Sequence, residues 1–127
     1  MQNRLRMNVA MFLIFYLQLD WRLGEKYFAQ KLYDYDYCQN VCNWMWCASW
    51  EQFSNPYFRV FAMHRQMKRF DSAAEYVKQW VPELNDVPAR DLIEWDKNYK
   101  NYPDVEYPIP LIKDLDSARQ VGIKQFR

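Results

Sequence analysis

Apolar side chains recur at the spacing of α-helices along most of this chain. A continuous apolar run over Met7–Leu19 predicts a first helix, from about Asn3 to Leu19, that is buried on nearly all sides. No segment shows the sustained apolar–polar alternation of a half-buried strand. The predicted fold class is therefore all-α. The predicted helices cover residues 3–19, 24–34, 41–49, 72–80, 89–99 and 111–120, with a helical turn at 57–61.

Residues that favour turns and caps separate these helices. Gly24 is predicted to punctuate the chain before the second helix, and the paired aspartates of residues 33–39 predict a loop. Asp71 is predicted to cap the helix over 72–80. That helix carries an apolar stripe formed by Ala74, Val77 and Trp80. Further breaks are expected at Asn55-Pro56, between Pro82 and Pro88, and in an extended tail that runs from Tyr102 and contains Pro103, Pro108 and Pro110.

The apolar run of the first helix could also be a membrane span or a leader. It covers 13 residues, whereas a spanning helix needs about 20. Arg4 and Arg6 precede it as in a signal peptide, but no A-x-A-like cleavage site follows. A buried helix explains the run better, and we expect a soluble, intracellular protein, cytoplasmic or nuclear, that does not use a membrane.

Composition adds a high share of aromatic residues to this picture. Half of the 127 residues are hydrophobic and 19% are aromatic, with two glycines, which indicates a globular chain of at most one domain. Aromatic rings fill cores and also stack on flat ligands. A heavy core and a cofactor pocket therefore both explain the composition.

Positive charge is concentrated in one interval, although the net charge of +1 by itself favours neither nucleic acid nor acidic partners. No acidic residue lies between Glu51 and Asp71. Such a run is either a solvated face or a surface that meets phosphates, and the aromatic residues interleaved with it favour the second explanation. The cations of this interval are Arg59, His64, Arg65, Lys68 and Arg69.

The three cysteines, Cys38, Cys42 and Cys47, do not predict a disulfide framework or a metal site. Their number is odd, which suggests a reducing compartment. His64 is the only histidine that could complete a metal site, so neither zinc nor an iron–sulfur cluster is expected. We interpret the cysteines as three buried small residues.

The segment Tyr33–Trp46 has the densest mixture of polar groups and indoles. Asp34 and Asp36 stand two residues apart, so in an extended loop one can pair with Arg6 of the first helix while the other reaches a ligand. Alternatively, both aspartates cap the helix that follows. The neighbouring polar and aromatic residues make a pocket for a planar cofactor with polar edges an open possibility. These neighbours are Asn40, Trp44 and Trp46.

Motifs in one unbroken order along the whole chain resemble the DNA photolyase and cryptochrome family. MQNRLRM resembles the family's W-M-H-N-R-x-R-M without its first residue, and DWRLGEKYF resembles D-W-R-x-G-E-x-Y-F. DYDYCQNVCNWMW resembles D-x-D-x-x-x-N-x-x-x-W-x-W, and PYFRVF, YVKQWVPEL and YPIPLI followed by SAR resemble the motifs that complete the domain. The resemblance implies the C-terminal part of the FAD-binding helical domain of a class I-like deoxyribodipyrimidine photolyase, with a bundle-like all-α fold and an extended proline-containing tail.

The resemblance also implies roles for individual residues around FAD. Asp34 would pair with Arg6 beside the flavin, and Asp36 would hydrogen-bond its polar edge. Asn40 would face the reactive nitrogen of the flavin, where a neutral amide can both donate and accept. The two tryptophans assigned to photoreduction are Trp44, nearest the flavin, and Trp21, the middle one; each could instead be a core indole.

On the DNA side, the resemblance implies contacts to a flipped pyrimidine dimer and to backbone phosphates. Asn3 and Met7, four residues apart, and the indole of Trp46 would touch the lesion. Arg59 and Arg69 would contact phosphates, with Arg65 and Lys68 as helpers. The implied reaction is light-driven splitting of cyclobutane dimers in UV-damaged DNA by an electron from reduced FAD, which is carbon–carbon lyase chemistry.

Residues 1–127 would form only part of the FAD- and DNA-binding domain, without the family's antenna domain and without the first half of the flavin domain. We expect the isolated chain to be marginally stable and inactive alone, and a separate chain could carry the N-terminal half. Tyr35 and Cys42 depart from the family motif, which has a small residue and a glycine there. The alternatives are a cryptochrome-type blue-light signalling module and a non-functional truncated remnant.

Overall fold

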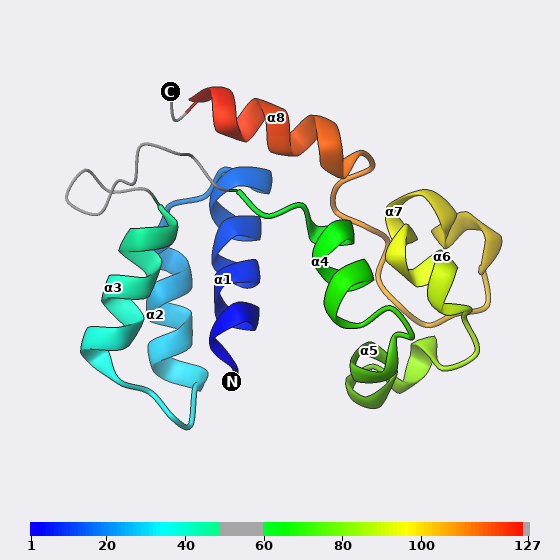
Figure 1. The fold of residues 1–127 in the computed structure, drawn as a ribbon, viewed down its shortest axis with the longest axis horizontal. Coiled ribbons are helices and arrows are strands. Elements are labelled where there is room, and N and C mark those ends of the chain that lie inside the picture. The colour runs from blue at the N-terminus through cyan, green and yellow to red at the C-terminus, as the bar shows by residue number, and fades with distance from the viewer. Residues whose placement is uncertain (49–59, 126–127) are drawn as a thin grey trace. The chain divides into compact units, whose positions relative to one another are not determined.

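The computed structural model describes residues 1–48 and 60–125, and every regular element in them is helical. The all-α prediction is confirmed. The chain divides into two compact units (Figure 1), of which unit 1 comprises Met1–Phe61 and Ala118–Arg127 and unit 2 comprises Ala62–Ser117. None of the described helices is long and apolar enough to cross a membrane.

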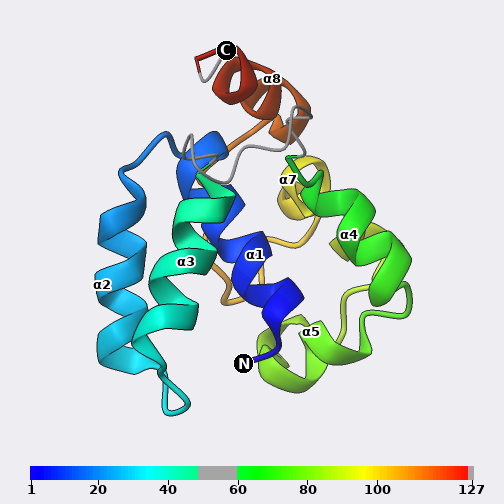
Figure 2. The same cartoon turned by 60° about the vertical axis from the view of Figure 1, so that its left-hand side comes forward.

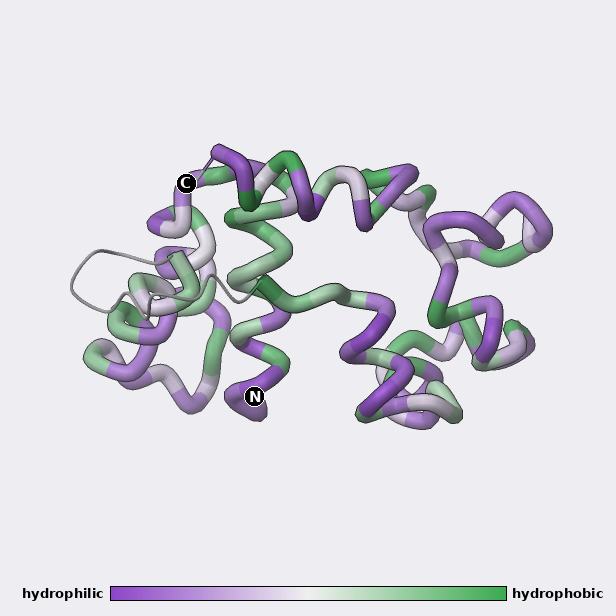
Figure 3. The backbone as a smooth tube through the Cα atoms, turned by 45° about the horizontal axis from the view of Figure 1, so that its top comes forward, coloured by the Kyte–Doolittle hydropathy of each residue, from purple (hydrophilic) through white to green (hydrophobic). Residues whose placement is uncertain are grey.

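The first helix of unit 1 is an α-helix that continues into a π-helical turn. α1 spans Asn3–Met11 and η1 spans Phe12–Tyr16. The helix therefore ends three residues earlier than predicted, because the backbone of Gln18 adopts a left-handed conformation with φ 56°. The buried residues all lie in its second half. Figure 3 shows that the chain also becomes more hydrophobic there. The buried residues are Ala10, Met11, Ile14, Phe15 and Tyr16.

The second helix, α2, spans Trp21–Lys31 and includes Gly24. The prediction that Gly24 separates two elements is wrong. The side chain of Asp20 accepts a hydrogen bond from the backbone N–H of Arg22 at 2.9 Å and starts the helix before the glycine. Gly24 is buried against Trp44, whose Cη2 lies 2.1 Å from where a Cβ would stand. The glycine therefore allows a close approach between helices.

The third helix, α3, spans Tyr37–Cys47 and packs beside α2 (Figure 2). It begins four residues earlier than predicted, because the Oδ1 atom of Asp36 accepts the backbone N–H of Gln39 at 2.8 Å. The rings of Phe28 on α2 and Trp44 on α3 meet edge to face, with centroids 5.2 Å apart. The contact between α2 and α3 is thus an aromatic one.

Unit 2 is built from short helices around a small core of Ala74, Leu84, Val87 and Leu92. Asp71 caps the first turn of α5 as predicted, since its carboxylate oxygens accept the backbone N–H groups of residues 76 and 77, both at 3.1 Å. The N-cap residue itself is Ala74, three positions later. The helix itself starts later than predicted. The elements are α4 (Met63–Phe70), α5 (Glu75–Trp80), η3 (Pro82–Leu84), α6 (Ala89–Ile93), α7 (Trp95–Asn98) and η4 (Tyr99–Asn101).

Three details of unit 2 differ from the sequence prediction. α4 was not predicted, because none of its residues is buried and its charge dominates its pattern. Trp80 does not join the apolar stripe of α5, since 66% of it is exposed. The predicted helix over 89–99 is interrupted at Glu94, whose backbone (φ −114°, ψ 44°) is not helical.

No helix occurs between residues 102 and 110, as predicted for the extended tail, nor between 111 and 114, which were predicted to be helical. The last helix, α8, spans Leu115–Gln125, beginning four residues later than predicted. Within unit 1, the guanidinium of Arg119 donates twice to the backbone oxygen of Val60, at 3.0 and 2.8 Å. Gly122 lies directly against the backbone of Phe15, where a Cβ would stand 1.9 Å from the carbonyl oxygen. These contacts dock the end of α8.

The cysteines are only partly as predicted. Cys47 is buried, and burial raises the pKa of its thiol to about 12. Cys38 and Cys42 are exposed on α3, so the expectation that all three are buried is wrong. Over residues 1–48 and 60–125, no group of three or more His, Cys, Asp or Glu side chains could hold a metal ion.

Candidate functional site

An ion pair joins α1 to the loop between α2 and α3. The Nη2 atom of Arg6 lies 2.6 Å from Oδ2 of Asp34, and the N-terminal ammonium of Met1 lies 3.0 Å from the same oxygen. The Nε atom of Arg6 also donates to the backbone oxygen of Met1 at 2.8 Å. The Arg6 side chain is 13% exposed and that of Asp34 54%. The structure thus brings together the two residues expected to pair.

The N-terminal ammonium and Arg6 lower the pKa of Asp34. The hydrogen bond from the N-terminal ammonium, followed by the charge of Arg6, holds the pKa of this carboxyl below its ordinary value of 3.8. The carboxylate therefore stays ionised at neutral pH and remains an acceptor for a ligand donor.

Asp36 has a different role from Asp34. Its Oδ1 atom caps α3 through the backbone N–H of Gln39. The capping explanation, which the sequence left open for both aspartates, holds for Asp36, whereas Asp34 takes the ion pair.

Asn40 is the one buried polar or charged side chain within the described residues, with 3% exposed. Its Nδ2 atom donates to the backbone oxygen and to Oε1 of Glu25, both at 3.1 Å. Glu25 therefore fixes the orientation of the amide. The Oδ1 atom of Asn40 is then the atom that can accept a hydrogen bond from a ligand. Sequence reasoning missed Glu25, although it stands inside the motif DWRLGEKYF.

Tyr35, which replaces the small residue of the family motif, lies close to this pair. Burial, followed by the charge of Glu25, raises the pKa of its phenol. Cys42, which replaces the glycine, is exposed on α3. Neither substitution disturbs the contact between Asn40 and Glu25.

The ion pair and Asn40 line the same cavity, of about 290 Å³. This volume is just below the roughly 300–1,000 Å³ of small-molecule sites, so the cavity suits part of a larger ligand. Its donors and acceptors are a guanidinium, a carboxylate and several amides, a set that fits the polar edge of a flavin ring. Gln39 and Asn43 are site residues that the sequence reasoning missed. The lining residues are Met1, Asn3, Arg6, Asp34, Gln39, Asn40 and Asn43.

Asn3, which was expected to contact the DNA lesion, lines the same cavity as Asn40. Its Nδ2 atom lies 3.7 Å from the sulfur of Met7, so the two residues share a face of α1 as their spacing predicts. Trp46 on α3 is 40% exposed.

The two tryptophans expected to relay electrons both belong to unit 1. Trp44 is fully buried beneath Gly24, and its Nε1 atom has no hydrogen-bond partner among residues 1–48 and 60–125. Trp21 is half-buried at the start of α2, with the Arg22 guanidinium 5.1 Å from its ring centroid. Trp21 also lines a cavity of about 340 Å³ with Asp20 and Ala48.

The basic interval lies mainly on α4 of unit 2. Arg69 is exposed, and its guanidinium stands 5.2 Å from the ring centroid of Phe70. Arg65 and Lys68 line a second cavity. Arg59, the other expected phosphate contact, lies outside the described residues.

Comparison with known proteins gives one consistent result. A family model described as the FAD binding domain of DNA photolyase matches residues 1–127. The chain is 41% identical over 134 residues to the deoxyribodipyrimidine photo-lyase of Alkalihalophilus pseudofirmus, covering 100% of this chain and 28% of the relative. It is 40% identical over 121 residues to that of Escherichia coli K12, covering 94% and 26%.

Solved structures show the same fold. A Synechocystis sp. PCC6803 cryptochrome superposes with a TM-score of 0.83 at 32% identity, covering 98% of this chain and 27% of its own. An archaeal photolyase from Sulfolobus tokodaii, solved with two FAD molecules, gives 0.81 at 38% identity, covering 97% and 27%. The chain spans about a quarter of the length of these relatives.

Proposed function

Because this chain belongs to the family of the FAD-binding domain of DNA photolyase, we propose that it forms the C-terminal part of the FAD- and DNA-binding domain of a light-dependent DNA repair flavoprotein. The observation that carries the proposal is the shared cavity of Arg6, Asp34 and Asn40. The remaining part of such an enzyme comes from the same polypeptide or from a separate chain.

Bound FAD would supply the light absorption and the transferable electron. The residues of this chain bind and orient it. Arg6 holds Asp34 ionised at the cavity, where the carboxylate accepts hydrogen bonds from the polar edge of the ring. Glu25 holds the Nδ2 atom of Asn40, so Oδ1 of Asn40 accepts from a ring N–H. Asp36 starts α3 and thereby places Asn40 at the cavity.

The indoles supply the electron path in this proposal. Trp44 is shielded from water by Gly24 and Phe28, so a charge on it is not trapped by solvent. Trp21, half-buried beside a cationic guanidinium, is the next member.

The substrate in this proposal is UV-damaged DNA that carries cyclobutane pyrimidine dimers. Asn3 and Met7 on α1 and Trp46 on α3 would contact the flipped dimer through an amide, a thioether and an indole face. Contacts to backbone phosphates set affinity without reading the DNA sequence. In this proposal they are made by Arg59, Arg65, Lys68 and Arg69.

A graft into a relative tests the proposal. The 127-residue chain replaces its counterpart in the E. coli photo-lyase, to which it is 40% identical. We expect the purified chimera to retain FAD, measured by absorbance after denaturation, and to restore blue-light survival to UV-irradiated cells that lack photolyase. A chimera that folds by circular dichroism but carries no FAD refutes the proposal.

Substitution of Asp34 sharpens this test. Asp34→Asn removes the negative charge from the cavity, and we expect FAD to bind about tenfold more weakly, as for a lost charge-assisted hydrogen bond. Asp104→Asn, an exposed change in the loop of unit 2, is the matched control and should leave FAD binding unchanged.

A cryptochrome-type signalling role is the second candidate, favoured by the superposition on the Synechocystis cryptochrome. Binding and repair of damaged DNA distinguish the signalling role from the repair role. A chimera that binds FAD but neither binds nor repairs dimer-containing DNA supports signalling.

A further inference from the structure

Unit 2 contains a cluster of aromatic rings that the proposed FAD site does not use. The ring of Trp95 on α7 stacks on that of Tyr102, with centroids 5.9 Å apart and an angle of 28° between the planes. Tyr107 meets the same indole edge to face, with centroids 6.0 Å apart. Trp95 and Tyr102 both pack against the core of unit 2, so the fold itself holds the two rings in contact.

The hydroxyl of Tyr102 has a proton acceptor within hydrogen-bond distance. It donates to the Oδ2 atom of Asp91 on α6. This hydrogen bond, followed by burial, raises the pKa of the phenol, so Tyr102 is protonated at neutral pH. Because the donor is a neutral phenol, Asp91 remains a carboxylate, which is a base that can take a proton.

The indole of Trp95 has no comparable acceptor. Its Nε1 atom is buried and has no hydrogen-bond partner among residues 1–48 and 60–125. The N–H proton of an oxidised indole is acidic and leaves only when a base is within reach. No group that the structure describes accepts it at Trp95, so an oxidised indole at this position keeps both its proton and its positive charge.

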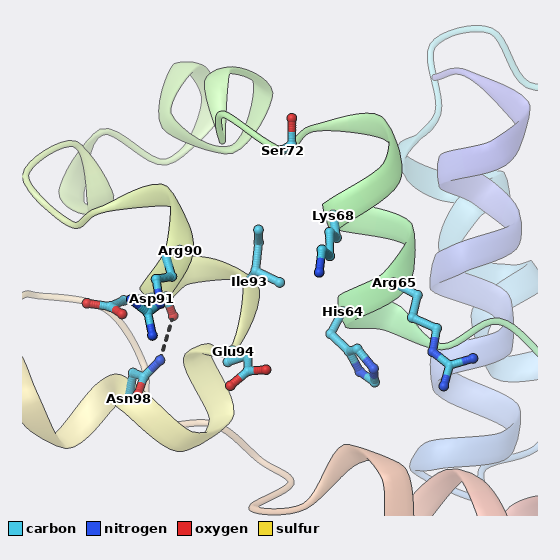
Figure 4. A pocket seen from close by; sticks show the side chains of 9 residues that line it. All are labelled: His64, Arg65, Lys68, Ser72, Arg90, Asp91, Ile93, Glu94 and Asn98. Atoms are coloured by element: carbon cyan, nitrogen blue, oxygen red, sulfur yellow. Dashed lines mark hydrogen bonds between the residues drawn. The ribbon is translucent and has the colours of Figure 1, made fainter.

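Asp91 connects this cluster to a cavity. It is among the residues that line a polar cavity of about 640 Å³, with α4 on one side and α6 and α7 on the other (Figure 4). In the same view the Nδ2 atom of Asn98 donates to the backbone oxygen of Asp91 at 3.5 Å. A polar cavity of this size admits water, so a proton on the Asp91 carboxyl can exchange with solvent.

We propose that Trp95 and Tyr102 form a one-electron redox pair, with Asp91 as the acceptor of the phenolic proton. A one-electron oxidant, such as an oxygen-centred radical or a photogenerated metal complex, takes an electron from Trp95 and is itself reduced. Tyr102 then gives one electron to the indole cation and its hydroxyl proton to Asp91. The products are a neutral indole, a phenoxyl radical and a protonated carboxyl. An electron from a small reductant such as ascorbate, together with the proton from Asp91, restores the phenol.

The direction of transfer follows from the two proton sites. An oxidised phenol is a far stronger acid than the phenol, so its proton moves to Asp91 as the electron leaves, and the radical that remains is neutral. A charge on Trp95, by contrast, stays in a partly buried site where charge is costly. Oxidising equivalents therefore collect on Tyr102 and spare the indole. The proposal concerns unit 2 alone and does not depend on flavin binding.

Two variants of the 127-residue chain test the pair. Asp91→Asn keeps an oxygen that accepts the Tyr102 hydroxyl but is not a base, and Tyr102→Phe keeps the stacked ring but has no hydroxyl. The matched controls are Asp104→Asn, an exposed change two residues after Tyr102, and Tyr99→Phe on η4. Circular dichroism checks that all four variants keep the fold.

The oxidant in this test is photogenerated tris(bipyridine)ruthenium(III), and the samples are frozen during illumination for electron paramagnetic resonance. We expect Asp91→Asn and Tyr102→Phe to lose the same phenoxyl component of the spectrum, and both controls to retain it. Peptide mass spectrometry then locates oxygen added to tryptophan. Oxidation of Trp95 should rise in Asp91→Asn and Tyr102→Phe, whereas oxidation of Trp80, exposed on α5, should be the same in every variant.

A purely structural hydrogen bond between Tyr102 and Asp91 gives a different outcome, because Asp91→Asn preserves an acceptor and would leave both readouts unchanged. That result overturns the proposal. It is also overturned if Trp95 is oxidised equally in the unaltered chain and in Tyr102→Phe, or if the controls lose the same phenoxyl component. Should one of the two test variants unfold, the other decides by the same readouts. FAD retention by the chimera is unaffected by any of these outcomes.

Discussion

Gly24 is the position where a single methyl group should test the packing of unit 1. The residue lies in the interior of α2, and an alanine Cβ there would stand 2.1 Å from Cη2 and 2.5 Å from Cζ3 of Trp44. Ordinary carbon contacts are about 3.5–4.0 Å. The ring must therefore shift by more than about 1 Å, and because Trp44 is fully buried, every direction leads into packed atoms.

Two opposing contributions set the size of the effect. Overpacking of this kind costs about 1–3 kcal/mol, and the severity of the contact places Gly24→Ala in the upper part of that range. Alanine stabilises a helix interior by about 1 kcal/mol relative to glycine. We expect a net loss of about 1–2 kcal/mol in the free energy of unfolding, measured by urea titration of the 127-residue chain with far-UV circular dichroism.

The double variant with Trp44→Phe isolates the contact. Phenylalanine lacks the outer indole carbons that meet the new methyl group, so in this background Gly24→Ala should stabilise the chain through helix propensity alone. The reasoning is refuted if Gly24→Ala stabilises the chain with Trp44 in place, or if its effect is equal in both backgrounds.

Three further predictions follow from single contacts. Asp71→Ala should lower the free energy of unfolding of unit 2 by about 1 kcal/mol, because two N–H groups of α5 lose their cap; an unchanged urea midpoint contradicts this. Iodoacetamide at neutral pH should alkylate two cysteines in the folded chain and spare Cys47, whose thiol has a pKa raised to about 12; modification of Cys47 seen by mass spectrometry would show that it is accessible. Asp34, with its pKa lowered by the N-terminal ammonium and Arg6, should stabilise the fold above about pH 4 and lose this effect as the pH falls through its folded-state pKa; Asp34→Asn should flatten that part of the pH–stability profile.

Local features of the structure could be predicted from the sequence to the extent that they depend on a few neighbouring residues. The helical periodicity of residues 3–16 and the cap by Asp71 each depend on contacts within a turn or two of the chain, and both are present. The pairing of Arg6 with Asp34, 28 residues apart, was expected because the motif order resembled a known family.

Features that depend on a partner helix could not be predicted in this way. Gly24 was interpreted as a break because glycine usually interrupts helices, whereas here it gives Trp44 room between α2 and α3. Glu25 became a site residue only when α2 and α3 packed together and brought it 3.1 Å from Asn40. Cys42 and Cys47, five residues apart on one helix, differ in exposure because only one of them faces the core.

The sequence by itself therefore determined the helical class, the family and three of the residues that line the cavity, Arg6, Asp34 and Asn40. The tertiary structure decided the interaction that each residue makes. Asp34 forms an ion pair with Arg6, Asp36 caps α3, and Asn40 donates to Glu25 on another helix. It alone brought together Lys68 and Arg90, which are 22 positions apart, on one cavity. The reason is physical, since periodicity and caps are set by neighbours in the chain, whereas burial and electrostatic pairing are set by whichever helix packs against them.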